Sequence, residues 1–290
     1  MTEVATRFAP SPTGRLHLGH AWSALLAHDF AARAHGHFLL RIEDIDPTRS
    51  RPDHVDGIIE DLLWLGLQWE GEIVFQSQRT ALYRMALEDL KRRGLVYPCF
   101  CTRSDIAREI AASASAPHGP DGPLYPGTCR HLAPDMAARR AEGEAHCWRL
   151  DTARAMAAAG PVDWVDGAGA RHPARADIHG DVVLARKDSP TSYHLSVTVD
   201  DAEQAISHVV RGRDLLEATH VHRLLQALLG LPSPVYVHHD LLGTADGARL
   251  AKRNGAPAIA DLRAAGVDPR HLVADLRAGI FPGGYRPLAL

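Results

Sequence analysis

The 290-residue chain has little of what would assign it to a class at once. It contains only four cysteines, and 32 Lys and Arg residues against 35 Asp and Glu residues give a formal net charge of -3. This near balance excludes a protein that binds polyanions through bulk charge, so any contact with nucleic acid must come from a local patch. Four cysteines without a secretory signal are typical of reduced thiols or metal ligands rather than of a disulfide framework.

Long apolar runs are also missing. No segment approaches the roughly 20 apolar residues of a membrane span, and the first residues, MTEVATRFAP, do not resemble a signal peptide. We therefore expect a cytoplasmic protein without membrane contact. Hydrophobic residues make up 46% of the chain, enough for a full core in one large domain with an insert or in two modest domains.

The first half of the chain alternates strand-like and helical patterns. In chain order, these patterns cover residues 4–9, 18–33, 38–42, 55–65 and 81–93. The alternation predicts an α/β fold in which helices cover a parallel sheet. Gly36 follows the first helical pattern and fits a helix C-cap.

The second half begins with a different composition. Residues 111–127, AASASAPHGPDGPLYPG, are rich in Ala, Ser, Pro and Gly and predict a mobile loop. Further on, a helical pattern at 218–229 between HVVRG and VYVHHDLL restores the α/β alternation. We therefore predict a nucleotide-binding fold that is split by an inserted subdomain. Its parts are 1–95 (first half), 96–190 (insert), 191–255 (second half) and 256–290 (a short helical C-terminus).

The segment RFAPSPTGRLHLGH, residues 7–20, carries the densest chemical signal. Its prolines and glycines predict a turn, after which a helix opens with His17 and His20 on one face. A helix N-terminus offers free N–H groups to a triphosphate, both imidazoles can donate to phosphate oxygens, and Gly19 lets a ligand approach the backbone. An isolated H-x-G-H string fits surface or capping histidines equally well, but the preceding turn favours the functional interpretation.

A second charged segment, RIEDIDPTR, covers residues 41–49. By itself it would be interpreted as a solvated charge cluster. Together, the two segments resemble the signatures of class I aminoacyl-tRNA synthetases of the glutamyl branch, which implies a Rossmann-type parallel sheet. The resemblance also implies that Arg7 and Ser11 help to hold glutamate and that Glu43 faces its amino group. Such a substrate needs a guanidinium for a carboxylate and an acid for the ammonium group.

Two later positions match the amino-acid pocket of the same family. The resemblance implies that Tyr193, in SYHLSVTVDD, lines this pocket and that Arg211, in HVVRGRDLL, meets a substrate carboxylate. Without the surrounding strings, the two would be interpreted as a core tyrosine and a surface arginine.

The family's second signature, KMSKS, corresponds here to residues 249–253, RLAKR. Arg249 replaces the first lysine and Ala251 replaces the serine, which puts the rate or the ATP affinity in question. Lys252 can stabilise the charge that accumulates on the leaving pyrophosphate. The resemblance implies ATP binding, with Mg²⁺, by His17, Gly19, His20, Arg249, Leu250 and Lys252. It also implies that His17, His20 and Lys252 are catalytic.

The string CFC places Cys99 and Cys101 one residue apart, with Cys129 downstream. C-x-C is tighter than the usual zinc spacing, so the residues alone favour buried thiols over zinc. A subset of the synthetases it resembles carries C-x-C and Y-x-x-x-C here, which implies one structural Zn²⁺ held by Cys99, Cys101, Tyr125 and Cys129. His118 and His131 compete with the tyrosine for the fourth position. We expect Cys147 in the core, without a partner.

Only residues 254–290 follow the KMSKS-like string, where glutamyl-tRNA synthetases continue with an anticodon-binding domain. This organisation resembles a branch of the family that activates L-glutamate with ATP in the absence of tRNA. That branch attaches the glutamyl group to queuosine in the anticodon loop of tRNA(Asp), and the wider family suggests a monomer. Three alternatives remain: a truncated glutamyl-tRNA synthetase that charges the 3′ end of tRNA(Glu), a non-catalytic paralogue that binds glutamate or ATP, and a small-molecule adenylyltransferase.

Overall fold

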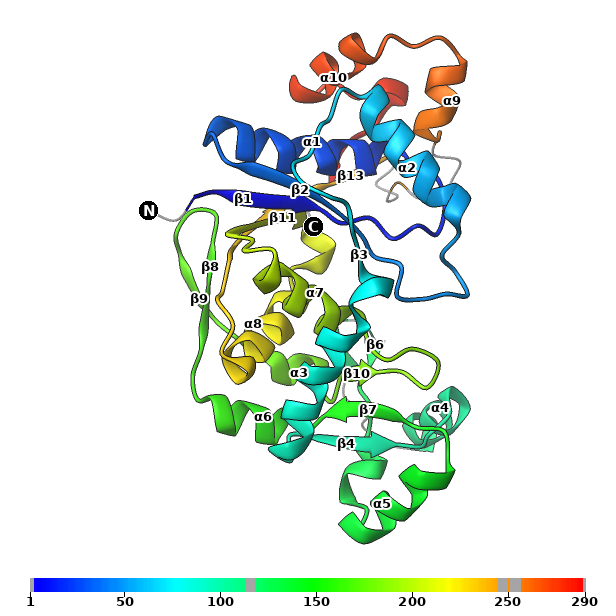
Figure 1. Ribbon diagram of the computed structural model, residues 1–290, viewed down its shortest axis with the longest axis vertical. Coiled ribbons are helices and arrows are strands. Elements are labelled where there is room, and N and C mark those ends of the chain that lie inside the picture. The colour runs from blue at the N-terminus through cyan, green and yellow to red at the C-terminus, as the bar shows by residue number, and fades with distance from the viewer. Residues whose placement is uncertain (1–2, 113–117, 121, 245–249, 251–256, 289–290) are drawn as a thin grey trace.

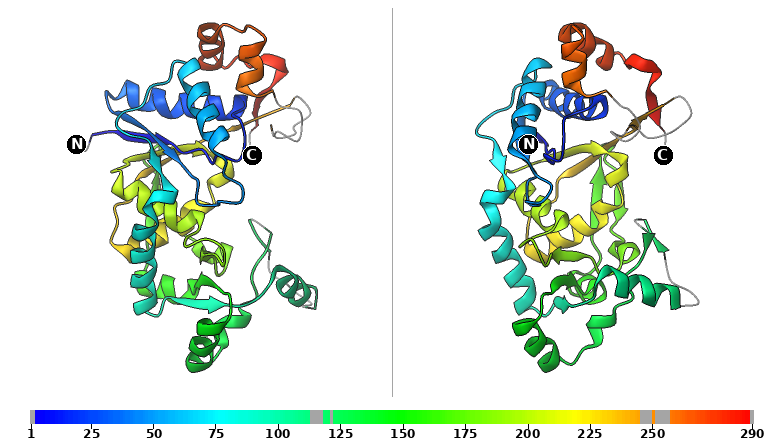
Figure 2. Two further views of the ribbon diagram at one scale, coloured as in Figure 1. Left: turned by 45° about the vertical axis from the view of Figure 1, so that its right-hand side comes forward. Right: turned by 90° about the vertical axis from the view of Figure 1, so that its right-hand side faces the viewer.

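A computed structural model describes residues 3–112, 118–120, 122–244, 250 and 257–288 of the chain. The molecule is elongated (Figure 1), and Figure 2 shows the C-terminal helices at the end opposite helix α5 (Pro134–Gly143). Among the described residues, no helix has the length and apolar character needed to cross a bilayer.

The expected parallel sheet is confirmed. Strands β1 (Ala5–Phe8), β2 (His37–Ile42) and β3 (Val74–Phe75) are parallel neighbours. Strand β11 (His208–Gly212) is parallel to β12 (Val235–His239). The two sets meet at β1 and β11, where the Ser207 N–H donates to the Ala5 carbonyl at 3.1 Å. Chain segments that are about 200 residues apart in the sequence thus lie side by side beneath the candidate site.

Helices cover both faces of this sheet (Figure 1). One face carries α1 (Leu18–Arg33) and α2 (Pro52–Trp64), and the other carries α3 (Thr80–Arg92), α7 (Tyr193–Glu203) and α8 (Ala218–Leu229). The buried face of α1 is rich in alanine, including Ala21, Ala24 and Ala27, so the helix can lie close to the strands. The Thr6 hydroxyl of β1 donates to the Ala27 carbonyl at 2.9 Å and fixes this approach.

The role predicted for Gly36 needs correction. Helix α1 ends at Arg33, and the residue with a positive φ is His35, at 50°. A Cβ atom on residue 36 would lie 2.1 Å from the Val4 carbonyl oxygen. Glycine is therefore required by the close passage of the chain before β1, and not by the conformation of the helix end.

The segment predicted as an insert has two parts. Strands β4 (Val96–Cys99), β7 (Cys147–Leu150) and β10 (Val183–Ala185) form an antiparallel sheet in the order β10-β7-β4. Around it lie α4 (Arg103–Ala112), the short strands β5 (His118–Gly119) and β6 (Gly122–Pro123), and α6 (Thr152–Ala159). The hairpin of β8 (Asp163–Asp166) and β9 (Arg171–Pro173) instead extends the other sheet, because β8 is parallel to β12. The predicted segment 96–190 thus includes strands that belong structurally with 208–239.

The C-terminal region, predicted to be short and helical, contains the helices α9 (Ile259–Ala264) and α10 (Pro269–Arg277). A final strand, β14 (Arg286–Leu288), is antiparallel to β13 (Leu241–Gly243) and was not predicted. The Ile259 N–H donates to the Leu16 carbonyl at 2.9 Å. The chain that follows the KMSKS-like string therefore returns to the histidine-bearing turn.

Candidate active site

The histidine-bearing turn opens α1 with a reciprocal cap. His17 is the N-cap residue, and its Nδ1 accepts from the Gly19 N–H at 3.1 Å, while His20 Nδ1 accepts from the His17 N–H at 3.2 Å. The two rings stack with their centroids 3.8 Å apart. A Cβ atom on residue 19 would lie 3.1 Å from the His17 ring, so glycine leaves room for this stack. The structure brings together the histidines and Gly19 as the motif requires.

The predicted residues of the KMSKS-like string are described only in part. Arg249 and Lys252 lie outside the described residues. Leu250 is 5% exposed and belongs to the core that also contains Leu18, and its N–H donates to the Leu242 carbonyl at 2.9 Å. Leu250 itself thus lies in the same core as the first residue of α1.

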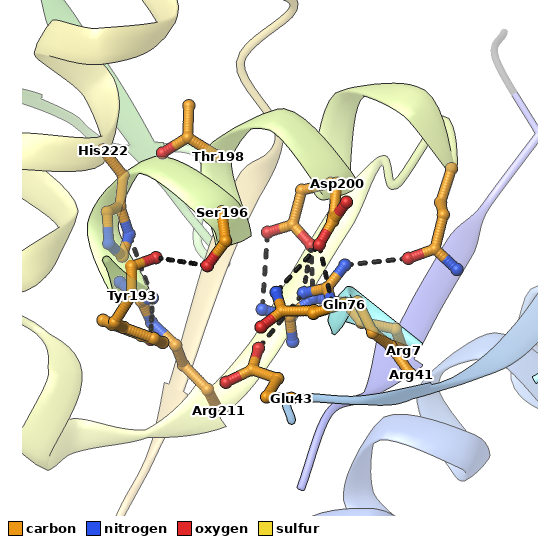
Figure 3. A network of polar contacts seen from close by, with 12 residues as sticks. Arg7, Arg41, Glu43, Gln76, Tyr193, Ser196, Thr198, Asp200, Arg211 and His222 are labelled. Carbon is orange, nitrogen blue, oxygen red and sulfur yellow. Dashed lines mark hydrogen bonds and ion pairs between the residues drawn. The ribbon is translucent and has the colours of Figure 1, made fainter. Parts of the chain in front are cut away.

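Arg7 and Arg41 lie on the neighbouring strands β1 and β2 and share one carboxylate (Figure 3). Arg7 Nε donates to Asp201 Oδ1 at 2.9 Å, and Arg41 Nη2 donates to the same oxygen at 2.9 Å. Arg7 is 5% exposed and Arg41 is fully buried. Burial raises the pKa of Asp201, but the two guanidinium groups outweigh this effect and hold it below its usual value. Arg7 can therefore meet a substrate only while it also pairs with Asp201.

Asp200, the next residue of α7, is also fully paired. Its carboxylate accepts from Gln76 Nε2 at 2.8 Å, Arg79 Nε at 2.7 Å and the Tyr83 hydroxyl at 2.8 Å. All three donors come from the segment that leads into α3 or from α3 itself. Asp200 thus joins α3 to α7 and has no free acceptor role toward a ligand.

Glu43 lies just after β2, 3.5 Å from Arg41, and its side chain is 9% exposed. Burial raises its pKa to about 7, even though Arg41 and Arg7 act in the opposite direction. Figure 3 shows this carboxylate between the Arg7 and Arg41 side chains and Arg211. Unlike its acidic neighbours, Glu43 receives no hydrogen bond from the side chains that the structure describes, so it can accept one from a bound ammonium group.

Arg211, on β11, is 5% exposed. No carboxylate of the described residues lies within ion-pair distance of its guanidinium. Its N–H groups donate to neutral acceptors: His238 Nε2 at 3.3 Å, Tyr193 Oη at 3.4 Å, His222 Nδ1 at 3.2 Å, the Leu215 carbonyl at 2.9 Å and Thr219 Oγ1 at 2.8 Å. A buried cation without a counter-ion is costly, which is the electrostatic condition for binding a carboxylate ligand.

Tyr193 begins α7 and connects the two groups of charges. Burial raises the pKa of its phenol, and the charges of Arg211, Glu43 and Arg7 all act on it. The structure therefore brings together four predicted residues, Arg7, Glu43, Tyr193 and Arg211. Ser11 is exposed in the turn after β1, where its carbonyl accepts from the Thr13 N–H at 2.8 Å.

The cysteines of the insert form a second candidate site. The Sγ atoms of Cys99, Cys101 and Cys129 lie within 4.8 Å of one another, a group that can hold a metal ion. The Tyr125 hydroxyl lies 3.4 Å from Cys99 Sγ and 3.6 Å from Cys101 Sγ. Burial raises the pKa of this phenol, so the field of a cation would be needed for it to bind as phenolate. Three thiols and one phenol fit a closed tetrahedral site.

Two histidines are the alternatives to Tyr125 for the fourth ligand position. His131 is exposed and lies outside the cysteine group, and the side chain of His118 is outside the described part of the chain. Cys147 lies in the core as a free thiol, as expected. It lies opposite Cys99 in the register of β4 and β7, and its hydrogen bond, with those of Tyr125 and Arg149, lowers the pKa of Cys99. A register between two strands cannot be read from a cysteine count.

Several residues around Arg211 were not predicted from the sequence. His222 and Thr219 lie on the buried face of α8, and His238 lies on β12. Polar residues at apolar positions of an amphipathic helix were the available signal, since Thr219 and His222 are almost fully buried. Their shared partner could not be read in this way, because β11 and α8 meet only through folding.

Comparison with known proteins agrees with this geometry. The family model for "tRNA synthetases class I (E and Q), catalytic domain" matches residues 3–286. A glutamyl-Q tRNA(Asp) synthetase from Rhodobacter capsulatus is 50% identical over 94% of this chain and 98% of its own. One from Symbiobacterium thermophilum is 46% identical over 93% of this chain and 84% of its own.

Solved structures give the same fold. A glutamate-tRNA synthetase from Elizabethkingia anophelis superimposes with a TM-score of 0.73 at 28% identity. A glutamate tRNA ligase from Elizabethkingia meningosepticum in complex with its amino acid gives a TM-score of 0.72 at 28% identity. In both cases 88% of this chain is covered, and it spans 53% of the longer chain.

Proposed function

Because the chain belongs to the class I tRNA synthetases of the glutamate and glutamine type, and within them to the glutamyl-Q tRNA(Asp) synthetases, we propose that it glutamylates queuosine. The reaction activates L-glutamate with ATP in the absence of tRNA. It then transfers the glutamyl group to queuosine in the anticodon loop of tRNA(Asp), which implies a cytoplasmic site of action.

One observation supports glutamate as the amino acid. Arg211 is a buried guanidinium with neutral neighbours, and Figure 3 shows Glu43, whose side chain is 9% exposed, close to it. A ligand with an ammonium group and two carboxylates satisfies both and leaves one carboxylate free to react. We assign the γ-carboxylate to Arg211, because a carboxylate that is fixed by a buried guanidinium is a poor nucleophile.

In the first step, the α-carboxylate attacks the α-phosphorus of ATP and pyrophosphate leaves. His17 and His20 at the start of α1 face developing charge on the phosphates, and the positive end of the helix dipole adds to this stabilisation. Mg²⁺ enters with ATP and neutralises phosphate charge. Lys252 would act on the same pyrophosphate from the KMSKS-like string.

In the second step, a hydroxyl on the cyclopentene ring of queuosine attacks the carbonyl of the adenylate, and AMP leaves. The described residues offer no dedicated base at this position. The phosphate oxygen of AMP can accept the hydroxyl proton as the bond forms. Positioning of the two reactants then supplies most of the rate increase.

The cysteine group would hold one structural zinc ion, with Tyr125 as the fourth ligand. Such an ion would join β4 to the turn Thr128–His131 and brace the insert. Metal analysis of the purified protein tests this assignment. We expect about one zinc per chain, loss of zinc in Cys101→Ser, and retention in the control Cys147→Ala. Zinc loss in Cys147→Ala with retention in Tyr125→Phe would identify Cys147 as the fourth ligand.

The function is tested by transfer of labelled glutamate, with ATP and Mg²⁺, to tRNA that contains or lacks queuosine. We expect label only with queuosine, and we expect it to survive removal of the 3′-terminal nucleosides. Label on both preparations would identify 3′-end charging of tRNA(Glu). Glutamate binding without glutamate-dependent ATP–pyrophosphate exchange would identify a non-catalytic paralogue.

A further inference from the structure

The mechanism above leaves two buried histidines unused. His222, on α8, is 2% exposed and lies between Arg211 and His194 of α7 (Figure 3 shows His222 beside Tyr193 and Arg211). Its Nδ1 is 3.2 Å from Arg211 Nη1, and its Nε2 is 3.2 Å from His194 Nδ1. These contacts form a chain that runs from the guanidinium through two imidazole rings.

The guanidinium of Arg211 determines which ring nitrogens of the two histidines carry a proton. A guanidinium has donors only, so His222 Nδ1 must be the unprotonated nitrogen that accepts from Arg211. In the neutral ring, the proton is then on Nε2, which donates to His194 Nδ1. Both histidines are therefore neutral, with the proton on Nε2.

The surroundings favour the neutral forms. Burial lowers the pKa of His222 well below its usual value, and Arg211, His194, Arg7 and His179 act in the same direction. Burial likewise lowers the pKa of His194 to about 4, with contributions from His179 and Arg211. No Asp or Glu side chain is among the main causes of either pKa shift.

A neutral acceptor and an acid would have different effects at this position. Either would hold the guanidinium in place, but an acid would also neutralise it, as Asp201 does for Arg7 and Arg41. The charge of Arg211 would then no longer be available to a ligand. An uncharged amide would lose less from this change than a carboxylate, because it forms no ion pair.

We propose that His222 is a specificity-determining residue. As a neutral hydrogen-bond acceptor it positions Arg211, and it leaves the positive charge of Arg211 available to the γ-carboxylate of glutamate. The inference rests on the proposed function, since it concerns the amino acid that is activated. His194 is a positioning residue in the same chain, because it accepts the Nε2 proton and so fixes the tautomer of His222.

Three substitutions separate the two roles of the ring. His222→Asn keeps a neutral acceptor close to the position of Nδ1, His222→Leu removes the acceptor, and His222→Asp adds a charge. ATP–pyrophosphate exchange gives kcat and KM for glutamate and for glutamine. His271→Asn, at a side chain of α10 that is 87% exposed, is the control for loss of a histidine.

We expect His222→Asn to stay within about threefold of the wild-type KM for glutamate. A hydrogen bond to a charged group predicts a rise of about 10- to 100-fold in KM for His222→Leu, with a smaller change in kcat. His222→Asp should show the largest rise and a loss of preference for glutamate over glutamine. A wild-type KM and glutamate preference in His222→Asp would overturn the proposal, as would a His222→Asn variant no better than His222→Leu.

A measurement on the wild type covers the case in which the variants do not fold. Nitrogen-15 NMR of the histidine rings distinguishes Nδ1–H from Nε2–H tautomers between about pH 6 and 8. We expect the Nε2–H tautomer for both His222 and His194, and an imidazolium or the other tautomer at His222 would refute the inference. Failure of the proposed function looks different, because the wild type itself would then show no glutamate-dependent exchange.

Discussion

Two groups of buried arginines lie side by side in this molecule. Arg7 and Arg41 both pair with Asp201, whereas Arg211 donates to histidines, a tyrosine, a threonine and a carbonyl. Exposure does not separate them, since all three side chains are at most 5% exposed. The difference lies in the partner: a paired guanidinium contributes to structure, and an unpaired one is prepared for a ligand.

The comparison explains why the same residue type needs different tests in the two groups. Removing one member of a buried ion pair leaves an uncompensated charge and lowers stability. Removing Arg211 leaves no buried acid of the described protein behind, so the loss should be in binding. Substitutions should therefore divide into those that change the free energy of unfolding and those that change glutamate binding.

The largest effect is expected for Arg211→Met. Loss of the partner of a buried carboxylate costs about 2–5 kcal/mol, so kcat/KM for glutamate in pyrophosphate exchange should fall by about 30- to 5,000-fold. The free energy of unfolding in urea should fall by less than in Asp201→Asn, because a buried charge without a counter-ion disappears together with its hydrogen bonds. Arg223→Met, on α8, is the control. Strong destabilisation with a normal KM would place Arg211 among the structural arginines.

Asp201→Asn should mainly lower the free energy of unfolding, whereas Arg211→Met should mainly weaken glutamate binding. Arg7 and Arg41 would lose their shared counter-ion, and the free energy of unfolding should fall by about 3 kcal/mol. Asp177→Asn is the matched control, because Asp177 pairs with Arg175 on the surface and such pairs contribute about 0–1 kcal/mol. Urea unfolding monitored by circular dichroism measures both. Equal small effects would show that the buried cluster contributes no more than a surface pair.

The neutral histidines around Arg211 predict loss of stability in acid. Burial lowers the pKa of His194 to about 4 and that of His238 to about 3, while unfolded histidine titrates near 6.5. Between these values the unfolded chain binds protons that the folded chain does not. Their stabilisation is complete above about pH 6.5 and is lost as the pH falls toward 4. Thermal unfolding should show a lower Tm at pH 5 than at pH 7.5, and this difference in Tm should be smaller in His238→Gln than in the wild type. An equal difference in the wild type and the variant would contradict the prediction.

The smallest effect concerns Glu43, whose pKa is raised to about 7 by burial. Below this pH the carboxyl group becomes neutral and loses its attraction for the ammonium group of glutamate. KM should therefore rise by up to about tenfold per pH unit below 7, and KM in Glu43→Gln should be high and independent of pH. A flat wild-type profile from pH 8 to 6 would show that Glu43 does not face the ammonium group.

Much of the local structure followed from the sequence. The predicted helices at 18–33 and 218–229 have the bounds of α1 and α8, because periodicity and capping are local properties. The motif matches also selected Glu43, Tyr193 and Arg211, which the structure places around one another. Their roles in binding remain predictions.

The partners of these residues could not be predicted in the same way. Asp201 is 194 positions from Arg7 in the sequence. The β8–β9 hairpin likewise pairs with β12, a strand that is distant in the sequence. Cys147 meets Cys99 only through the pairing of β4 and β7. Such contacts depend on strand order and packing, which no local pattern encodes.

By itself, the sequence determined where most helices and strands form and which side chains are proposed to carry the chemistry, since both depend on short-range patterns and on residue type. Only the tertiary structure decided which buried arginines have an acid beside them. Arg7 and Arg41 meet Asp201, and Arg211 meets the neutral ring of His222. The charge that is left for a substrate depends on these distant neighbours, because burial makes every unpaired charge count.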